Sequence, residues 1–257
     1  MYYSKIIAFL AALLTLSACG GGGVSVTQLP NPADTSTPEV QALNGIWDGD
    51  YTDNSGKICS DVKALTYNGS VYAISEGCNV IFAGTLNVDG SNVTISFDLF
   101  DTEGVSTGGA ALSGSFTPQS QINGSLNDGS SLNLIYNTVY EADSSLALIN
   151  NGWGLSETTA TATYLYLFDI NGAGELTSLN TASGCSYTGT FSIIDPDYNL
   201  YAMNLTVSGC TDNFESRNGN YGGIASLSTN TQELTVLVAN DQNAFFAEFL
   251  SLTGKQN

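Results

Sequence analysis

Apolar and polar residues alternate along much of the chain from about residue 45 onwards. The segment Val93–Leu99 reads Val-Thr-Ile-Ser-Phe-Asp-Leu, so every second side chain is apolar. In a later segment, Tyr201, Met203, Leu205 and Val207 fall on one face in the same way. A period of two residues is typical of a strand with one buried face. The pattern therefore predicts a body made of β-strands.

Tight-turn signals separate these alternating runs. Asn-Gly or Asp-Gly pairs occur at Asn68-Gly69, Asp89-Gly90, Asp128-Gly129 and Asn171-Gly172. Such pairs accept the positive φ angles of two-residue hairpin turns, whose twist matches that of the strands. Dividing the chain at turns predicts eight short strands in each half. In the first half we expect them at 45–52, 57–66, 70–76, 79–88, 92–100, 108–117, 120–127 and 130–137, and in the second at 151–156, 161–169, 174–181, 184–194, 199–208, 219–228, 231–239 and 243–251.

Two landmarks indicate an internal duplication. Asn44-Gly45-Ile46-Trp47 is echoed by Asn151-Gly152-Trp153, with the two tryptophans 106 residues apart. Gly77-Cys78 is echoed by Gly184-Cys185 at a separation of 107. Two landmarks with nearly the same offset predict two related units rather than a solenoid. We place the first β domain at 43–142 and the second at 143–257.

Eight antiparallel strands joined by tight turns favour a closed up-and-down barrel, because closure removes exposed sheet edges. A β-sandwich of the same strands is the alternative. The Gly45-Ile46-Trp47 segment resembles the opening strand of lipocalin-type barrels, where the tryptophan closes one end, although Asn151-Gly152-Trp153 departs from that spacing.

An eight-stranded barrel is either filled by side chains or holds one small ligand. We expect filled cores here, with a ligand cavity as the alternative. The large inward-facing candidates are Phe82, Leu86, Phe97, Phe191, Tyr201, Phe245 and Phe249.

The N-terminus has the layout of a secretory signal. Lys5 precedes the apolar run Ile6–Leu16, which is too short to span a bilayer. The segment Leu16-Ser17-Ala18-Cys19 that follows resembles the lipobox of bacterial lipoproteins. That resemblance implies removal of residues 1–18 and acylation of Cys19, including a palmitate-type chain. Gly20, rather than Asp, follows the cysteine, which in that family implies the outer membrane, on either its periplasmic or its surface face. The alternative is a plain signal peptide.

Residues 19–42 are rich in Gly, Pro, Ser and Thr and have little to bury. We expect them to form a disordered tether between the acylated cysteine and the first domain.

The charge of the chain restricts its partners. It has 24 acidic residues, 5 basic residues and no histidine, and a net charge of −19. Such an acidic surface repels nucleic acid, which we exclude as a partner. The remaining partners are the membrane through the N-terminal lipid, an envelope or host protein, or a small apolar ligand.

Four cysteines remain besides Cys19, namely Cys59, Cys78, Cys185 and Cys210. An even number in an exported protein predicts two disulfides, of which three connectivities are possible. We favour Cys59–Cys78 and Cys185–Cys210, because each pair lies within one half of the chain. The wide spacing and the lack of histidine argue against a zinc site.

Few catalytic chemistries fit the sequence. Serine nucleophiles normally need a histidine base, which is absent, and neither a phosphate loop nor a dinucleotide fingerprint occurs. Asp48 and Asp50 share a strand face and form a candidate acid–base pair, for which solvated strand-end acids are the simpler interpretation. We therefore expect a non-enzymatic binding or interaction module without a cofactor. The alternatives are a carrier of a small apolar ligand and a carboxylate-based hydrolase.

Three further motifs have a structural and a functional interpretation. Residues 169–175 resemble half of a calcium loop but lack the remaining ligands, so a hairpin turn is expected. Residues 195–199 are likewise expected to form a turn. The pairs Tyr198/Tyr201 and Tyr164/Tyr166 are candidates for an exposed binding platform or, more simply, for core or barrel-rim positions.

Overall fold

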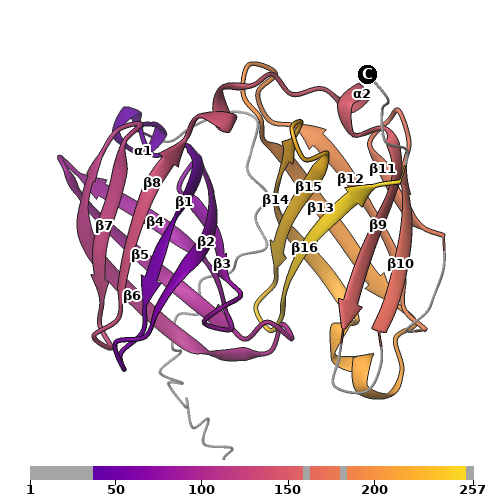
Figure 1. Cartoon of the computed structure of the whole chain (residues 1–257), viewed down its shortest axis with the longest axis horizontal. Coiled ribbons are helices and arrows are strands. Elements are labelled where there is room, and N and C mark those ends of the chain that lie inside the picture. The colour runs from indigo at the N-terminus through magenta and orange to yellow at the C-terminus, as the bar shows by residue number, and fades with distance from the viewer. Residues whose placement is uncertain (1–36, 159–162, 180–183, 253–257) are drawn as a thin grey trace, which may run out of the picture.

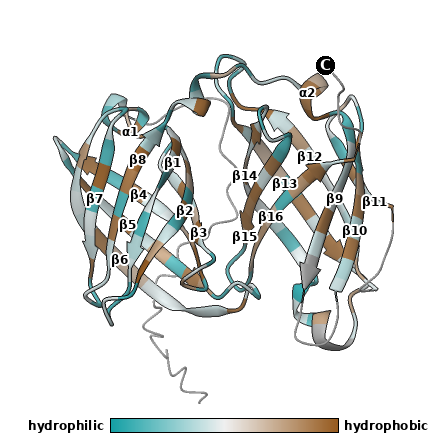
Figure 2. Ribbon diagram, in the orientation of Figure 1, coloured by the Kyte–Doolittle hydropathy of each residue, from teal (hydrophilic) through white to brown (hydrophobic). Residues whose placement is uncertain are grey.

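The chain folds into two antiparallel β-barrels in tandem (Figure 1). The computed structural model describes residues 37–158, 163–179 and 184–252. The predicted signal segment, Cys19 and most of the predicted tether lie outside these residues. Hydropathy alternates along the strands of both barrels, as the sequence pattern requires (Figure 2).

Barrel 1 is an eight-stranded meander. Each strand pairs with the next, and β1 also pairs with β8 over seven residue pairs from Ile46↔Asn137 to Thr52↔Ser131. This closure confirms the barrel rather than the sandwich. The strands are β1 (Gly45–Thr52), β2 (Ile58–Tyr67), β3 (Ser70–Ser75), β4 (Val80–Asp89), β5 (Asn92–Phe100), β6 (Ser106–Thr117), β7 (Gln121–Leu126) and β8 (Ser131–Asn137).

Barrel 2 repeats this topology, and its first strand pairs with both its second and its last. The strands are β9 (Asn151–Thr158), β10 (Thr163–Ile170), β11 (Glu175–Ser178), β12 (Ser186–Ile193), β13 (Tyr201–Ser208), β14 (Gly219–Ser228), β15 (Glu233–Ala239) and β16 (Ala244–Ser251). All sixteen predicted strands overlap an observed one. Residues 161–162 and 180–181 of the predicted strands lie outside the described residues.

The two landmarks of the predicted duplication occupy equivalent places. Trp47 and Trp153 are each the third residue of the first strand of their barrel. Gly77-Cys78 and Gly184-Cys185 each lie between the third and fourth strands. The landmarks that recur in the sequence therefore also occupy equivalent positions in the two barrels.

Each tryptophan lies inside its barrel and is tied to the chain segment before the first strand. The Trp47 indole N–H donates to Thr66 Oγ1 at 2.9 Å, and the Thr66 hydroxyl donates to the Leu43 carbonyl. The Trp153 indole N–H donates to the Ile149 carbonyl at 2.9 Å. Burial of an indole with its N–H satisfied combines a large apolar contact with no polar penalty.

The predicted tether ends earlier than expected. Residues Pro38–Gln41 form a short helix, α1, which Thr37 caps by accepting from the Val40 N–H at 3.5 Å. Proline is favourable in the first helical turn because its fixed φ suits the helix. Val40 and Ala42 pack on the core of barrel 1. The prediction of a tether through residue 42 was therefore wrong for its last residues, which have apolar surface to bury.

The interior of barrel 1 is packed with side chains, as expected. Phe82 lies between Tyr51 and Phe97, with ring centroids 5.3 and 5.2 Å away and edge-to-face geometry. Leu86 belongs to the same cluster. In barrel 2, Phe191, Tyr201 and Phe249 are buried as predicted, and Phe245 packs against their cluster.

The two barrels share an apolar interface made of outward-facing side chains. Leu65, Tyr72 and Ile74 of barrel 1 form one buried cluster with Ile224 and Leu237 of barrel 2. The strands in contact are β2, β3 and β4 on one side and β14, β15 and β16 on the other. These strands are therefore buried on both faces, and the barrels associate as one unit.

The connection between β8 and β9 reinforces this interface. It contains the 3₁₀-helix η1 (Thr138–Glu141) and the helix α2 (Leu146–Ile149). Tyr140 of η1 stacks on Tyr198 at 4.6 Å, and the Asn199 side-chain amide donates to the Val139 carbonyl at 3.2 Å. The predicted domain boundary at residues 142 and 143 falls within this connection.

Both predicted disulfides are confirmed. Cys59–Cys78 has a Cα–Cα distance of 5.8 Å, and Cys185–Cys210 has one of 4.1 Å. Each cross-link lies within one barrel: Cys78, between β3 and β4, is joined to β2, and Cys185, between β11 and β12, is joined to the connection between β13 and η2.

Across the described residues, no helix has the length and hydropathy needed to cross a membrane.

Candidate functional site

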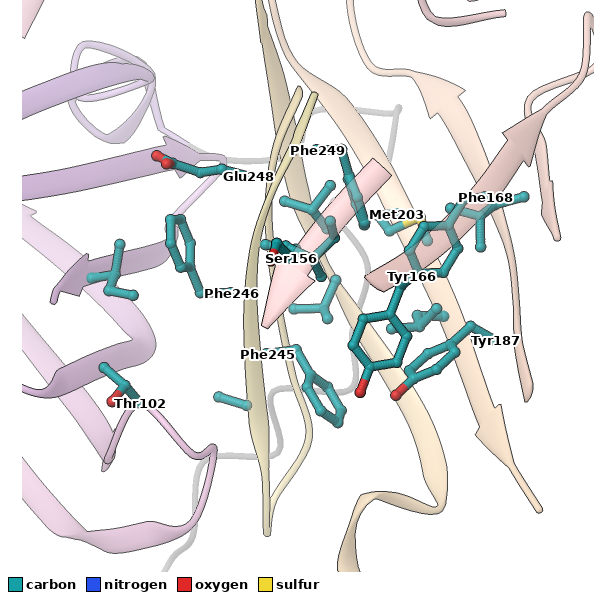
Figure 3. Close-up of a pocket in the computed structure, with 18 of the residues that line it drawn as sticks. Thr102, Ser156, Tyr166, Phe168, Tyr187, Met203, Phe245, Phe246, Glu248 and Phe249 are labelled. Carbon is teal, nitrogen blue, oxygen red and sulfur yellow. The ribbon is translucent and has the colours of Figure 1, made fainter. Parts of the chain in front are cut away.

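A cavity of about 430 Å³ extends from the interior of barrel 2 to the side of that barrel that faces barrel 1 (Figure 3). Its walls are mainly apolar and include Phe168, Met203, Val236 and Phe249, which face inward from four different strands. The expectation of a filled core was therefore wrong for barrel 2. The volume lies in the range of about 300–1,000 Å³ that is typical of small-molecule sites.

The cavity exists because the seam of barrel 2 is only partly closed. Strands β16 and β9 share two residue pairs, Leu250↔Gly154 and Ser251↔Trp153, whereas the corresponding seam of barrel 1 has seven. Beyond Gly154, β9 continues along β10 alone. The two seam strands therefore diverge, and Leu155 and Ser156 line the resulting opening.

Aromatic rings line the end of barrel 2 where the seam is open. Tyr166 and Tyr187 meet edge to face at 5.7 Å, and Tyr221 meets Phe245 at 4.7 Å. Tyr166 and Tyr187 lie side by side, with both hydroxyls pointing toward the lower end of the view (Figure 3). Burial raises the pKa of Tyr221 to about 12, against the hydrogen bond from Asn240 and the charge of Arg217. The Tyr166 and Tyr187 hydroxyls supply polarity at one end of an apolar cavity.

Among the described residues that line the cavity, one cation, Arg217, lies at the same end. The 3₁₀-helix η2 (Asp212–Arg217) connects β13 to β14 at the foot of barrel 2 (Figure 1). The Arg217 guanidinium lies over the Phe214 ring at 4.6 Å and over the Phe245 ring at 5.8 Å, and Arg217 lines the cavity. Both distances are within the range of cation–π attraction. Arg217 is the only arginine in the sequence.

Barrel 1 covers the side of the cavity mouth. Ile74, Glu76, Thr102 and Glu103 of barrel 1 line it together with Glu248 of β16. In Figure 3, Phe246 and Glu248 point away from Phe245 and Phe249, toward barrel 1, as alternation along a strand requires.

A charged clamp joins the barrels beside this mouth. Lys63 Nζ lies 3.2 Å from Glu233 Oε1 and also contacts Glu248 Oε1. Burial disfavours the charge on Lys63, but the hydrogen bonds and charges of the two glutamates outweigh it and raise the Lys63 pKa. Burial also disfavours the charge on Glu248 and raises its pKa, although the hydrogen bond and the charge of Lys63 act in the opposite direction. The clamp links β2 of barrel 1 to β15 and β16 of barrel 2.

The aspartates proposed as an acid–base pair lie elsewhere. Asp48 and Asp50 are on the outer side of barrel 1, since the alternate residues Trp47 and Tyr51 belong to its core. Asp48 is exposed and accepts a hydrogen bond from Asn137 Nδ2 at 2.5 Å. Neither aspartate lines the barrel 2 cavity.

The calcium-like segment forms the expected turn between β10 and β11. Asn171 Oδ1 accepts from the backbone N–H groups of Ala173 and Glu175 at 2.9 and 3.1 Å. The second segment is also a turn, with Asp195 Oδ1 accepting from the Asp197 N–H at 3.0 Å. In the described ranges, no three His, Cys, Asp or Glu residues are grouped as metal ligands would be.

The tyrosine pairs do not form an exposed platform. Tyr201 is fully buried, and its hydroxyl exchanges hydrogen bonds with the backbone of Ser145 at 3.2 Å. Tyr198 stacks on Tyr140 between the barrels. Tyr166 is buried in the wall of the cavity, and Tyr164 packs edge to face on Phe214 at 5.4 Å. The four tyrosines therefore occupy core or rim positions, which was the simpler of the two interpretations.

Sequence reasoning did not single out Arg217, which lines this cavity. The available signal was its uniqueness, since the other four basic residues of this acidic chain are lysines.

Comparison with known proteins gives no match: no family model, no curated protein and no solved structure resembles the chain at a significant level.

Proposed function

We propose that this protein is a lipid-anchored binding protein of the cell envelope, and that barrel 2 binds a small apolar ligand without transforming it. The observation that carries the proposal is the 430 Å³ cavity with its mainly apolar wall. Burial of apolar ligand surface contributes about 25 cal/mol per Å². A cavity of this size therefore offers enough contact for a specific ligand, whereas the packed interior of barrel 1 suits a structural role.

The anchor in this proposal comes from the sequence around Cys19. A lipid at that position would hold both barrels beside a membrane, and the acidic surface would keep them from adhering to anionic lipid head groups. Residence at a membrane places an apolar-ligand carrier next to a source of apolar molecules. We propose the outer membrane as the location, and the proposal covers both its periplasmic and its surface face.

Photolabelling tests the proposed site. The full chain, in vesicles of neutral lipid, is irradiated with a neutral C12 alcohol that carries a diazirine, and the labelled residues are mapped by peptide mass spectrometry. We expect label on cavity-lining segments such as β13 and β16. An Ala247→Phe variant adds a ring at a buried lining position of β16, and label there should fall at least tenfold.

A matched variant controls for the added ring. Thr190→Phe places the same ring on the exposed outer face of β12 and should leave the labelling unchanged. Label confined to the outer surface, or equal label in the wild type and Ala247→Phe, would refute the proposed function.

A further inference from the structure

We infer that a polar cleft between the two barrels is a second binding site, and that it takes a short neutral oligosaccharide of pyranose units. The cleft has a volume of about 520 Å³ and shares no lining residue with the barrel 2 cavity. The inference is therefore independent of the ligand proposed for that cavity. It rests on the place of the cleft in the fold, on the hydrogen-bonding groups that line it, and on its charge.

The cleft lies where connecting segments of both barrels meet. Barrel 1 contributes the segment from α1 to β1 and the turn between β6 and β7, and barrel 2 contributes the turn between β12 and β13. The 3₁₀-helix η1, which follows β8, adds Tyr140 to the wall. In Figure 1, α1 and the connection that follows β8 lie at the same end of the molecule. The cleft therefore depends on the association of the barrels.

Two tyrosine hydroxyls in this wall are available to a ligand. The Tyr140 and Tyr198 rings are stacked at 4.6 Å, and Tyr140 is 5% exposed. Within the described part of the chain, the protein forms no hydrogen bond to either hydroxyl, and the fully buried side-chain polar group that lacks a partner is the Tyr72 hydroxyl. The Tyr140 hydroxyl is therefore accessible from the cleft that this residue lines.

The surroundings of Tyr140 keep its hydroxyl protonated. Burial raises the pKa of Tyr140 above its ordinary value, and the neighbouring Tyr136 and Tyr198 groups raise this pKa further. A protonated phenol can both donate and accept a hydrogen bond. The hydroxyl can therefore pair with a ligand group of either kind.

Amide side chains add donors and acceptors to the same lining. Asn44 Oδ1 accepts from the Asn68 N–H at 2.8 Å, which leaves the Asn44 amino group to donate. Gln119 Nε2 donates to Glu141 Oε1 at 3.2 Å, which leaves the Gln119 carbonyl oxygen to accept. Gln41, at the end of α1, is exposed and also lines the cleft. Phenols, amides and sugar hydroxyls all donate and accept, so several hydroxyls of one ligand can be paired at once.

The rest of the lining matches the shape of a pyranose. Such a ring carries hydroxyls around its edge and C–H groups on its faces, so it needs apolar surface as well as polar groups. Ala42, Pro118 and Ile194 provide that surface alongside the tyrosines and amides. A sugar unit is roughly six times the size of a water molecule, which occupies roughly 30 Å³, so a cleft of 520 Å³ holds about two or three units.

The charge of the lining favours a neutral ligand. Among the described residues that line the cleft, Asp195 is the one charged side chain, and its Oδ1 already accepts from the Asp197 N–H at 3.0 Å. The net charge of −19 repels anions from the chain as a whole. A ligand with an amine is the alternative that Asp195 would favour, but one carboxylate beside water attracts a cation only weakly.

Saturation-transfer NMR on the full chain in neutral-lipid vesicles tests the site, with protein-free vesicles as the blank. The probes are maltotriose and cellotriose, which are neutral, the glucosamine trimer, which is cationic, and trigalacturonate, which is anionic. We expect at least one neutral trisaccharide to bind with a Kd of about 1 mM or below, and both charged trimers to bind at least about fivefold more weakly.

Two variants remove cleft groups that bond nothing else in the described part of the chain. Tyr140→Phe and Gln41→Leu should each raise the Kd of the neutral trisaccharide about threefold, because each removes one hydrogen-bonding group from the cleft. Tyr72→Phe is the matched control. It removes an unbonded hydroxyl from the same apolar cluster as Tyr140 but outside the cleft lining, and should leave the Kd unchanged.

Three results would overturn this inference. They are the absence of transfer to both neutral trisaccharides at about 5 mM, tighter binding of either charged trimer, and an equal Kd in the wild type and both cleft variants. None of them bears on the ligand of the barrel 2 cavity, which photolabelling tests separately.

Discussion

The hydroxyl of Tyr72 offers a sharp test of the interface between the barrels. Tyr72 is 2% exposed, and within the described ranges its hydroxyl is the buried side-chain polar group that lacks a hydrogen-bond partner. It lies among the apolar side chains that β3 presents to barrel 2. A buried polar group without a partner costs about 1–3 kcal/mol. We therefore expect Tyr72→Phe to raise the free energy of unfolding by about 1 kcal/mol.

Tyr201 provides the matched control, because it is equally buried but its hydroxyl is bonded to Ser145. Tyr201→Phe should lower the free energy of unfolding by about 1 kcal/mol, since the Ser145 backbone groups lose their partner. Urea unfolding of both variants with intact disulfides measures the two changes. In a chain of this size, 1 kcal/mol corresponds to a shift of roughly 2–4 °C in Tm. Destabilisation by Tyr72→Phe would show that the interface does not bury this hydroxyl as described.

Three further predictions concern the charged clamp, the second disulfide and alkaline pH. Lys63→Met should lower the free energy of unfolding, measured by urea titration, by about 1 kcal/mol, because it leaves two half-buried glutamates without their cation. Lys57 is exposed, and Lys57→Met should change the same quantity by less than about 0.5 kcal/mol. Replacing Cys185 and Cys210 by alanine should lower it by about 3 kcal/mol, read from the urea midpoint, and a change below 1 kcal/mol would contradict the cross-link. Burial raises the pKa of Tyr72 to about 12, so this tyrosine ionises first in the unfolded chain, and the free energy of unfolding falls above pH 10 until the folded pKa is reached. The free energy of unfolding of Tyr72→Phe should therefore fall less steeply between pH 10 and 12 than that of the wild type. Parallel curves for the two proteins would contradict the burial of Tyr72.

The strand order was predictable because its causes are local. Alternation in segments such as Val93–Leu99 and the turn at Asn68-Gly69 depend on neighbouring residues alone. At that turn both residues have positive φ, 49° and 83°, as the sequence signal requires. The disulfides were predictable for a related reason, since each pairs cysteines of one half.

The interface between the barrels was harder to foresee. Strand β15 has apolar residues on both faces, with Val236 and Val238 in the barrel and Leu237 and Ala239 against barrel 1. A continuous apolar run of this kind indicates that both faces of the strand are buried, but it does not identify the element that covers the outer face.

The cavity was not predictable from the pattern. It depends on how few residues of β9 and β16 pair, and these strands are about a hundred residues apart in the sequence. Seam register is a long-range property, because it follows from the packing of all eight strands. The place of Arg217 beside the cavity depends on the same geometry, which brings η2 to the open end.

The stoichiometry of photolabelling tests the central claim most directly. Intact-mass measurement of the full chain, titrated with the neutral C12 diazirine alcohol in neutral-lipid vesicles, should show cavity labelling that saturates at one probe per chain and is abolished in Ala247→Phe. Labelling that rises without saturation, or that is the same in Ala247→Phe, would contradict a ligand site inside barrel 2.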